Sequence, residues 1–147
     1  MDALQHFLES ARNTFDAFAQ QVSAAELHAA AELIWSAQAE GNRVHVTGIG
    51  KPGHVATYLA SLMSSTGTPT YFLHGTEAVH GSCGQLVPGD VVIFISNSGE
   101  TAELLATIRA IRNNGCEVIA VTGRPDAQLL PVKMLLVALA LALTLIV

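Results

Sequence analysis

Apolar residues recur at helical spacing through about the first forty positions of the chain. The first of the two helices that this spacing predicts carries the apolar positions Leu4, Phe7, Leu8, Ala11, Phe15 and Phe18. Ser23 and Glu26 form a plausible capping box at the start of the second helix, which continues with Leu27, Ala30, Ala31, Ile34 and Trp35. Because Gly41 and Asn42 mark the end of this pattern, we expect residues 1–40 to be an N-terminal helical pair.

From residue 43 the pattern changes to short apolar runs separated by predicted helices. Strands are expected at 43–50, 68–75, 90–96 and 116–123, with helices at 52–65 and 99–115. The run DVVIFIS at 90–96 is the most continuous, so we expect it to be the central strand. Strands alternating with helices are typical of a parallel sheet covered on both faces. The prediction is an α/β fold, with a three-layer, doubly wound, flavodoxin-like sheet in residues 41–147.

The last part of the chain, 129–147, is almost wholly apolar. Its uninterrupted run of 14 residues follows Pro131 and Lys133 and is shorter than the ~20 residues that a membrane helix needs. We therefore expect a buried helix, in the core or at a subunit interface, and no membrane contact. The same run would also fit a small tail anchor.

Composition narrows the classes of function. The chain has 147 residues, enough for one domain, and a net charge of −5 without a lysine or arginine cluster, which argues against nucleic-acid binding. A single bound phosphate needs only a local site, so the acidic balance leaves phosphorylated metabolites open. Cys83 and Cys116 lie in no CxxC pattern, and the first residues do not resemble a secretory leader, so we expect a cytoplasmic protein.

The expected ligand site lies just beyond the carboxyl ends of the strands, as in other open parallel sheets. Three such ends read VTGIGKPGH, FLHGTEAVHG and FISNSGET, and two of them lead into helix N-termini, which favour anions. The stretch ISNSGET (95–101) adds the hydroxyls of Ser96, Ser98 and Thr101, and this combination predicts a phosphate cradle. An ordinary helix cap, with Ser98 at the N-cap and Glu100 in the first turn, would leave the other polar side chains of this stretch unexplained.

The sequence SNSGET after a strand resembles the phosphate loop of sugar isomerase (SIS) domains. The segments TGIGKPGH, STGTPTYFLHGTEAVHG, PGDVVIFISNSGET and VTGRP are similar, in this order, to the D-arabinose-5-phosphate isomerase branch, from about residue 40 to about 128. The resemblance implies about five parallel strands and assembly as homo-dimers or homo-tetramers. It also implies interconversion of D-arabinose 5-phosphate and D-ribulose 5-phosphate, which feeds synthesis of the Kdo sugar of lipopolysaccharide.

Carried over by position, the resemblance implies a substrate- and phosphate-binding set made of Gly48, Gly50, Ser96, Asn97, Ser98, Gly99 and Thr101. Lys51 and Glu100 match the family's active-site lysine and glutamate, and His80 matches a histidine near its pocket. These three residues are therefore the catalytic candidates.

Their residue types suit the chemistry. Aldose–ketose isomerisation opens the sugar ring and moves a proton between C2 and C1 through a cis-enediol, which needs a base, an acid and positive charge near the oxyanion. Lys51 could supply the charge, unless it is a solvated surface lysine, and Glu100 could transfer protons, unless it only caps a helix. His54, His74 and His80 follow strand ends, where a histidine can serve ring opening, proton transfer or metal binding. Their spacing fits no fixed ligand pattern, so we expect no metal and no cofactor.

The sequence departs from the family pattern after VTGRPDAQL. The family continues with a glutamate loop of EACP type, a TSST-type phosphate turn and an SHPGG-type histidine segment, and many members add paired CBS domains. These motifs do not occur in residues 129–147. Since the resemblance places the catalytic base and the ring-opening histidine there, two alternatives stay open: a non-catalytic sugar-phosphate-binding module, and another phosphosugar enzyme on the same fold.

Overall fold

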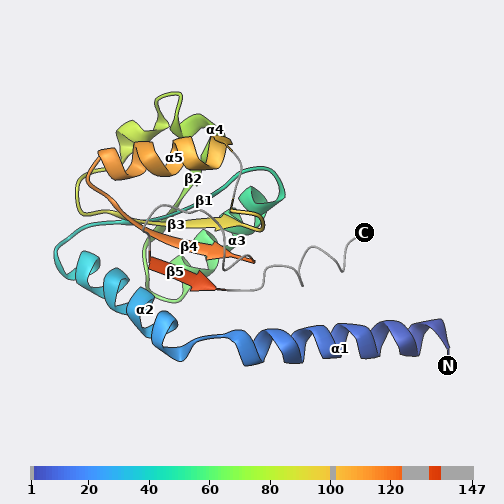
Figure 1. The fold of residues 1–147 in the computed structure, drawn as a ribbon. Helices are drawn as coiled ribbons and strands as arrows, with labels where there is room; N and C mark the ends of the chain where they lie inside the picture. Colours follow the sequence, from blue (N-terminus) through green and yellow to red (C-terminus); the bar gives the residue numbers. More distant parts are fainter. Residues whose placement is uncertain (1, 100–101, 124–132, 137–147) are drawn as a thin grey trace.

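The computed structural model describes residues 2–99, 102–123 and 133–136. Its centre is a five-stranded parallel sheet in the order β2-β1-β3-β4-β5, the flavodoxin-like order (Figure 1). The strands are β1 (Val44–Gly48), β2 (Thr70–His74), β3 (Val91–Ser96), β4 (Glu117–Thr122) and β5 (Lys133–Leu136). The helices are α1 (Ala3–Gln21), α2 (Ala24–Ala39), α3 (Lys51–Ser65), α4 (Gly75–Ala78) and α5 (Ala102–Asn113), with a short 3-10 turn, η1 (Ser82–Gln85).

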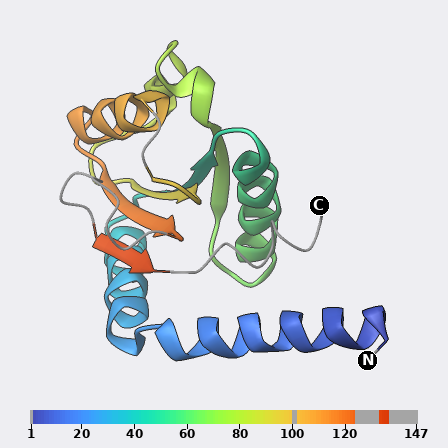
Figure 2. The same ribbon diagram turned by 45° about the vertical axis from the view of Figure 1, so that its right-hand side comes forward.

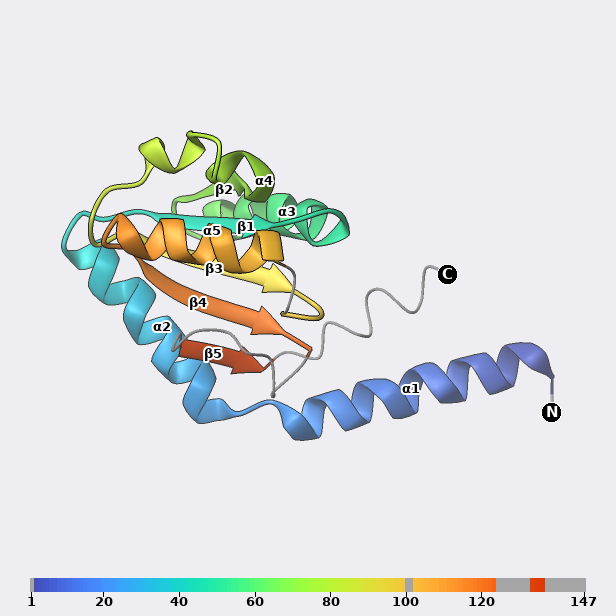
Figure 3. The same cartoon turned by 45° about the horizontal axis from the view of Figure 1, so that its top comes forward.

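Helices cover both faces of the sheet, which confirms the predicted three-layer α/β fold (Figure 3). On one face, α2 and α3 present small residues, Ala30, Ala37, Ala56 and Ala60, to the valines and isoleucines of β1, β3 and β4. On the other face, α4 and α5 pack against β2, β3 and β4 through a core that includes Leu73, Val92, Phe94, Leu104 and Ile108. β3 pairs with strands on both sides and its first five residues are buried, so its predicted central place is confirmed.

The N-terminal helical pair is confirmed, and Ser23 caps the second helix by accepting a hydrogen bond from the Glu26 amide at 3.2 Å. α1 projects from the sheet and its flanking helices, and none of its residues is buried (Figure 1 and Figure 2). It exposes the large apolar side chains of Leu4, Phe7, Leu8 and Phe15. The described part of the chain therefore leaves one apolar side of α1 open to water.

The apolar tail differs from the prediction where the structure describes it. Lys133–Leu136 form β5, which pairs with β4 in the register Ile119↔Lys133 to Thr122↔Leu136, so the helix expected from Met134 is wrong for 134–136. A short apolar run fits a buried strand or a buried helix equally well, and the open edge of β4 offers it backbone partners. Residues 137–147 lie outside the described part. Among the described helices, none combines the length and the apolar character that a membrane crossing requires.

A cluster of charged side chains around the buried Asp90 lies at the amino edge of the sheet, where β1 and β3 begin. The Asp90 carboxylate accepts hydrogen bonds from the backbone amides of Arg43 and Val87, at 2.9 and 3.0 Å, and from Arg43 Nη2 at 3.0 Å. His45 Nε2 lies 3.2 Å from the same carboxylate. Burial acts to raise the pKa of Asp90, but the hydrogen bonds from Val87 and Arg43 outweigh it and hold that pKa below its ordinary value. Burial lowers the pKa of His45, against the opposing effect of Asp90.

Candidate active site at the carboxyl edge of the sheet

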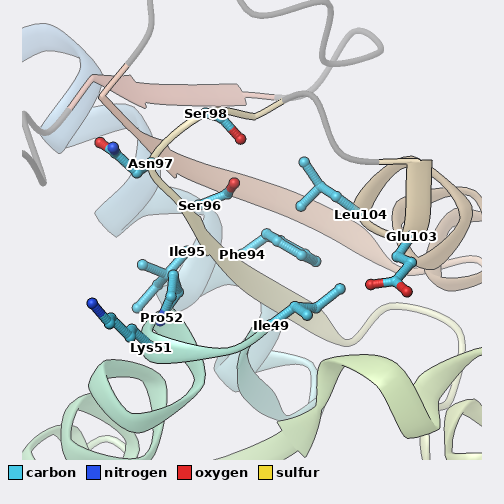
Figure 4. Close-up of a pocket in the computed structure, with 10 residues that line it drawn as sticks. All are labelled: Ile49, Lys51, Pro52, Phe94, Ile95, Ser96, Asn97, Ser98, Glu103 and Leu104. Atoms are coloured by element: carbon cyan, nitrogen blue, oxygen red, sulfur yellow. The ribbon is translucent and has the colours of Figure 1, made fainter.

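A cavity of about 400 Å³ opens at the carboxyl edge of the sheet, where β1 and β3 end (Figure 4). Its lining residues are Ile49, Lys51, Pro52, Phe94, Ile95, Ser96, Asn97, Ser98, Glu103 and Leu104. The volume lies within the ~300–1,000 Å³ range of small-molecule sites. The cavity therefore brings together four residues that the sequence predicted for the site, Lys51, Ser96, Asn97 and Ser98. It also includes Glu103, which the sequence did not predict.

The loop after β3 supplies the hydroxyl groups. Ser96 Oγ accepts a hydrogen bond from the Gly99 amide at 3.0 Å, which folds the loop into a tight turn. The hydroxyls of Ser96 and Ser98 point into the cavity (Figure 4). Since a hydroxyl that accepts one hydrogen bond keeps its own proton to donate, Ser96 can still bind an anion.

The alternative interpretation of this loop was an ordinary cap with Ser98 at the N-cap. Gly99 follows Ser98 with a φ of +66°, which is not helical, so Ser98 is not the residue before the first helical position. The described part of α5 begins at Ala102, later than the predicted residue 99. The geometry thus argues against the ordinary cap at Ser98, and the phosphate cradle stays a prediction. Glu100 and Thr101 lie outside the described residues.

The turn between β1 and α3 brings backbone to the opposite side of the cavity. A Cβ on Gly48 would lie 2.7 Å from the carbonyl carbon of Pro52, so only glycine lets the end of β1 approach the first turn of α3 this closely. Gly50 caps α3 with a φ of +68°, in the region that favours glycine. These two predicted glycines therefore act through backbone shape, which places Lys51 at the first position of α3.

Lys51 stands at the rim of the cavity. Its side chain is exposed, and its amine points outward, away from the hydroxyls of Ser96 and Ser98 (Figure 4). Within the described residues it forms no ion pair. A flexible, unpaired cation beside a cluster of hydroxyls is suited to meet an anionic ligand as it binds.

Glu103 lies on the far side of the cavity, in the first turn of α5. Its carboxylate points toward the cavity, across the apolar side chains of Ile49, Phe94 and Leu104 (Figure 4). The sequence does not single out Glu103, because only its neighbours, up to Thr101, belong to the recognised motif. The signal available was its position in the first turn of the helix that follows the serine loop.

Not every candidate faces this cavity. Asn97 lines it, but its side chain points away (Figure 4), and its Oδ1 lies 2.6 Å from where a Cβ on Gly123 would be. His54 and His74 line a second cavity of about 310 Å³ on the other side of the β1–α3 turn. His80 is exposed after α4 and lines neither cavity. In the described ranges, no three or more His, Cys, Asp or Glu side chains gather closely enough to hold a metal ion.

Comparison with known proteins identifies the family to which the chain is similar. The family model described as the SIS domain matches residues 39–133. The arabinose 5-phosphate isomerase KdsD of Shigella flexneri is 45% identical over 87 residues, which is 59% of this chain and 26% of that protein. The KdsD of Pseudomonas aeruginosa is also 45% identical over 87 residues, covering 59% of this chain and 27% of its own length. The chain thus spans about a quarter of the length of the curated relatives that it matches.

A solved structure extends the match beyond the sheet. The protein c3406 of Escherichia coli CFT073, in complex with arabinose 5-phosphate, superposes with a TM-score of 0.71 at 37% sequence identity. The match covers 92% of this chain and 74% of that one. The resemblance noted from the sequence is thereby confirmed, and the chain belongs to the SIS-domain family.

Proposed function

We propose that the chain binds a sugar phosphate at its carboxyl edge and acts as an aldose–ketose isomerase, interconverting D-arabinose 5-phosphate and D-ribulose 5-phosphate. The observation that carries the proposal is the cavity that joins the serine loop, Lys51 and an apolar wall. The name of the KdsD relatives and the arabinose 5-phosphate bound by c3406 support this choice of sugar phosphate. We assign the activity to residues 41–147.

In this proposal the phosphate lies against the loop after β3. Ser96 and Ser98 donate their hydroxyl protons to phosphate oxygens, as their orientation into the cavity supports (Figure 4). The carbon chain of the sugar then extends along the apolar wall of Ile49, Phe94 and Leu104. This arrangement holds the reacting end of the sugar away from the phosphate and in a fixed orientation.

The base removes the C2 proton of the aldose while O1 gains a proton, which gives the cis-enediol. O2 then loses its proton as C1 gains one, so no atom is gained or lost overall. Lys51, whose amine points outward in the structure, turns toward the bound sugar in this proposal and supplies positive charge that stabilises the oxyanion as it develops. The proposal gives proton transfer to Glu100, which matches the family's active-site glutamate, and the acid of ring opening to His80, which matches a histidine near its pocket. Because His80 lines neither cavity in the chain alone, its role requires a change in its surroundings when substrate or a second subunit is present.

We also propose that the protein is a cytoplasmic homo-dimer or homo-tetramer. The described residues leave the apolar side of α1 uncovered, with Leu4, Phe7, Leu8 and Phe15 exposed. This supports association with another copy, because helix faces of this kind are normally covered. Cys83 and Cys116 are both free and buried, which is compatible with a reducing compartment.

The test is proton NMR of D-arabinose 5-phosphate incubated with the chain in heavy water. The isomerase proposal expects loss of the C2 proton signal and appearance of D-ribulose 5-phosphate. Lys51→Ala should lower kcat/KM by about 100-fold or more, the typical effect of losing one group that stabilises an oxyanion. Arg109→Ala removes an exposed cation of α5 that lies outside the cavity, and it should leave the rate unchanged.

A second candidate function is a sugar-phosphate-binding module without turnover. It is favoured by the segment 129–147, which is apolar where the family resemblance places a glutamate loop and a second phosphate-contacting turn. This candidate expects calorimetric binding of the sugar phosphate with an unchanged proton spectrum. Exchange at C2 would exclude it.

A further inference from the structure

Gly75 packs tightly against the turn that follows β1. It comes directly after β2, whose last residue, His74, pairs in register with Gly48. A Cβ on Gly75 would lie 2.7 Å from Ile49 Cγ1 and 2.9 Å from the Gly48 carbonyl oxygen. Because the φ of Gly75 is outside the left-handed region, glycine is required here by the lack of space beside the β1–α3 turn.

The carbonyl oxygen of Gly75 is bonded to α5. It accepts a hydrogen bond from Thr107 Oγ1 at 3.1 Å, and the same hydroxyl lies 2.9 Å from the carbonyl oxygen of Glu103. A threonine inside a helix often bonds the carbonyl four residues earlier, which accounts for the contact with Glu103 but not for the one with Gly75. Thr107 is fully buried, and α4 and α5 lie side by side on one face of the sheet (Figure 1). The bond to Gly75 therefore ties α5 to the start of α4.

These contacts connect two walls of the cavity through residues that do not line it. Ile49 belongs to the wall formed by the β1–α3 turn, and Glu103 and Leu104 belong to the wall formed by α5. Neither Gly75 nor Thr107 lines the cavity. A ligand that contacts both walls depends on the distance between them, whereas a ligand bound at the serine loop alone does not.

We propose that Gly75 and Thr107 are positioning residues that fix the distance between the β1–α3 turn and α5, and so the width of the sugar-phosphate cavity. This inference rests on the proposed function for the identity of the ligand, and it adds two residues outside the cavity that determine how well the ligand fits. In a purely structural role, the hydroxyl of Thr107 would only satisfy buried carbonyl groups. That role predicts a loss of stability without a selective loss of affinity.

The experiment compares variants at Thr107 by isothermal calorimetry on the full chain, with D-arabinose 5-phosphate and inorganic phosphate as ligands. Thr107→Val keeps the branched shape of the side chain and removes the hydroxyl, so it should weaken D-arabinose 5-phosphate about tenfold. Inorganic phosphate, which needs only the serine loop, should bind as tightly as it does to the wild type. Thr107→Ser retains a hydroxyl at this position and should therefore keep the wild-type affinity for the sugar phosphate.

A matched control separates the loss of a buried hydroxyl from the loss of this particular contact. Thr70 is also buried, and its Oγ1 donates to the Thr68 carbonyl at 2.8 Å, at the amino end of β2. Thr70→Val should lower the urea midpoint as Thr107→Val does, and leave the affinity for both ligands unchanged. Gly75→Ala adds a methyl group against the backbone of Gly48, so it should weaken the sugar phosphate more than Thr107→Val does.

Equal losses for the sugar phosphate and inorganic phosphate, or a loss in Thr107→Ser as large as in Thr107→Val, would overturn the positioning role. If Thr107→Val does not fold, Thr107→Ala removes the same hydroxyl with a better helix former, and the same comparison applies.

The same measurements keep this role apart from the isomerase proposal. If the wild-type chain binds D-arabinose 5-phosphate without exchanging its C2 proton, the isomerase proposal fails and the calorimetric comparison still decides on Gly75 and Thr107. If the wild type isomerises the sugar and Thr107→Val matches it in affinity and in kcat/KM, the isomerase proposal stands and the positioning role falls. A wild-type chain that binds no sugar phosphate contradicts both.

Discussion

At the amino ends of the central strands the charged side chain of Asp90 is paired and buried, whereas the charged side chains at the carboxyl ends are exposed and have no ion-pair partner among the described residues. At the amino edge, Asp90 is fully buried and its carboxylate meets Arg43, His45 and the Val87 amide within 3.2 Å. At the carboxyl edge, Lys51 and Glu103 are exposed, and neither side chain has an ion-pair partner among the described residues. Both edges belong to the same strands, β1 and β3, which are only 5 and 6 residues long.

This contrast distinguishes charges that stabilise the fold from charges that are available to a ligand under the proposed function. A buried charge must find its partners during folding, because an uncompensated one is very costly. An exposed charge beside a cavity is solvated by water, so leaving it unpaired costs the fold little free energy. It therefore remains available to pair with a charged ligand. Substitutions at the amino edge should therefore change stability, and substitutions at the carboxyl edge should change affinity.

The largest effect is expected for Asp90→Asn. It keeps the size of the side chain but removes the charge that Arg43 and His45 face, so we expect a loss of roughly 3–5 kcal/mol in the free energy of unfolding. Urea denaturation measures this loss. Asp16→Asn is the control, since its pair with Arg12 spans 3.9 Å on the exposed surface of α1 and should contribute about 1 kcal/mol or less. Similar losses in the two variants would break the distinction between the edges.

Ser96→Ala should show the reverse pattern. We expect affinity for inorganic phosphate to fall by about tenfold or more, because a hydrogen bond to a charged ligand is lost. Stability should fall by only about 1 kcal/mol, from the lost acceptor of the Gly99 amide. Ser65→Ala is matched to it, since Ser65 Oγ also makes one local hydrogen bond, to the Leu62 carbonyl, and lies outside the cavity. Calorimetry that found equal phosphate affinity in both variants would remove Ser96 from the binding site.

Structural features that depend on residues adjacent in the chain could be predicted from the sequence. The strand at 90–96 and the turn at Gly48 and Gly50 follow from apolar runs and glycines that are adjacent in the chain. The serine loop was recognisable for the same reason, because Ser96 and Ser98 belong to one continuous motif. The placement of Lys51 at the cavity follows directly from the glycine turn that precedes it.

Features that depend on distant contacts could not be predicted. Residues 133–136 form β5 by pairing with the edge of β4 that β3 leaves open. The apolar pattern of these four residues does not indicate that such a pairing partner is available. Arg43 and Asp90 are separated by 47 residues, so their pairing has no local signal. Glu103 faces the cavity because of the way α5 packs on the sheet. The sequence shows only that Glu103 is near the start of a helix, not which way that helix turns its first-turn carboxylate.

The smallest effect, a pH dependence, tests the amino edge without disturbing its packing. The pKa of His45 is lowered by burial in the folded chain, so the unfolded chain takes up this proton at a higher pH. The contribution of neutral His45 to stability is therefore complete above about pH 6.5, its unfolded value, and declines as pH falls toward the folded value, by at most about 1.4 kcal/mol per pH unit. Asp90, whose pKa is lowered, loses its contribution only at a much lower pH, as the carboxylate becomes protonated.

His45→Gln should flatten the stability profile just below pH 6.5. The groups that face this histidine are Asp90, Arg43 and the ring of Tyr71, 5.7 Å away between centroids, and all three remain in the variant. His6→Gln, at an exposed position of α1, controls for the loss of one histidine. Denaturation midpoints measured from pH 7.5 down to pH 5 give the slope of each variant. A shallower slope in His45→Gln than in His6→Gln would show that burial at the amino edge keeps this histidine neutral, whereas equal slopes would mean that Asp90 compensates its burial in full.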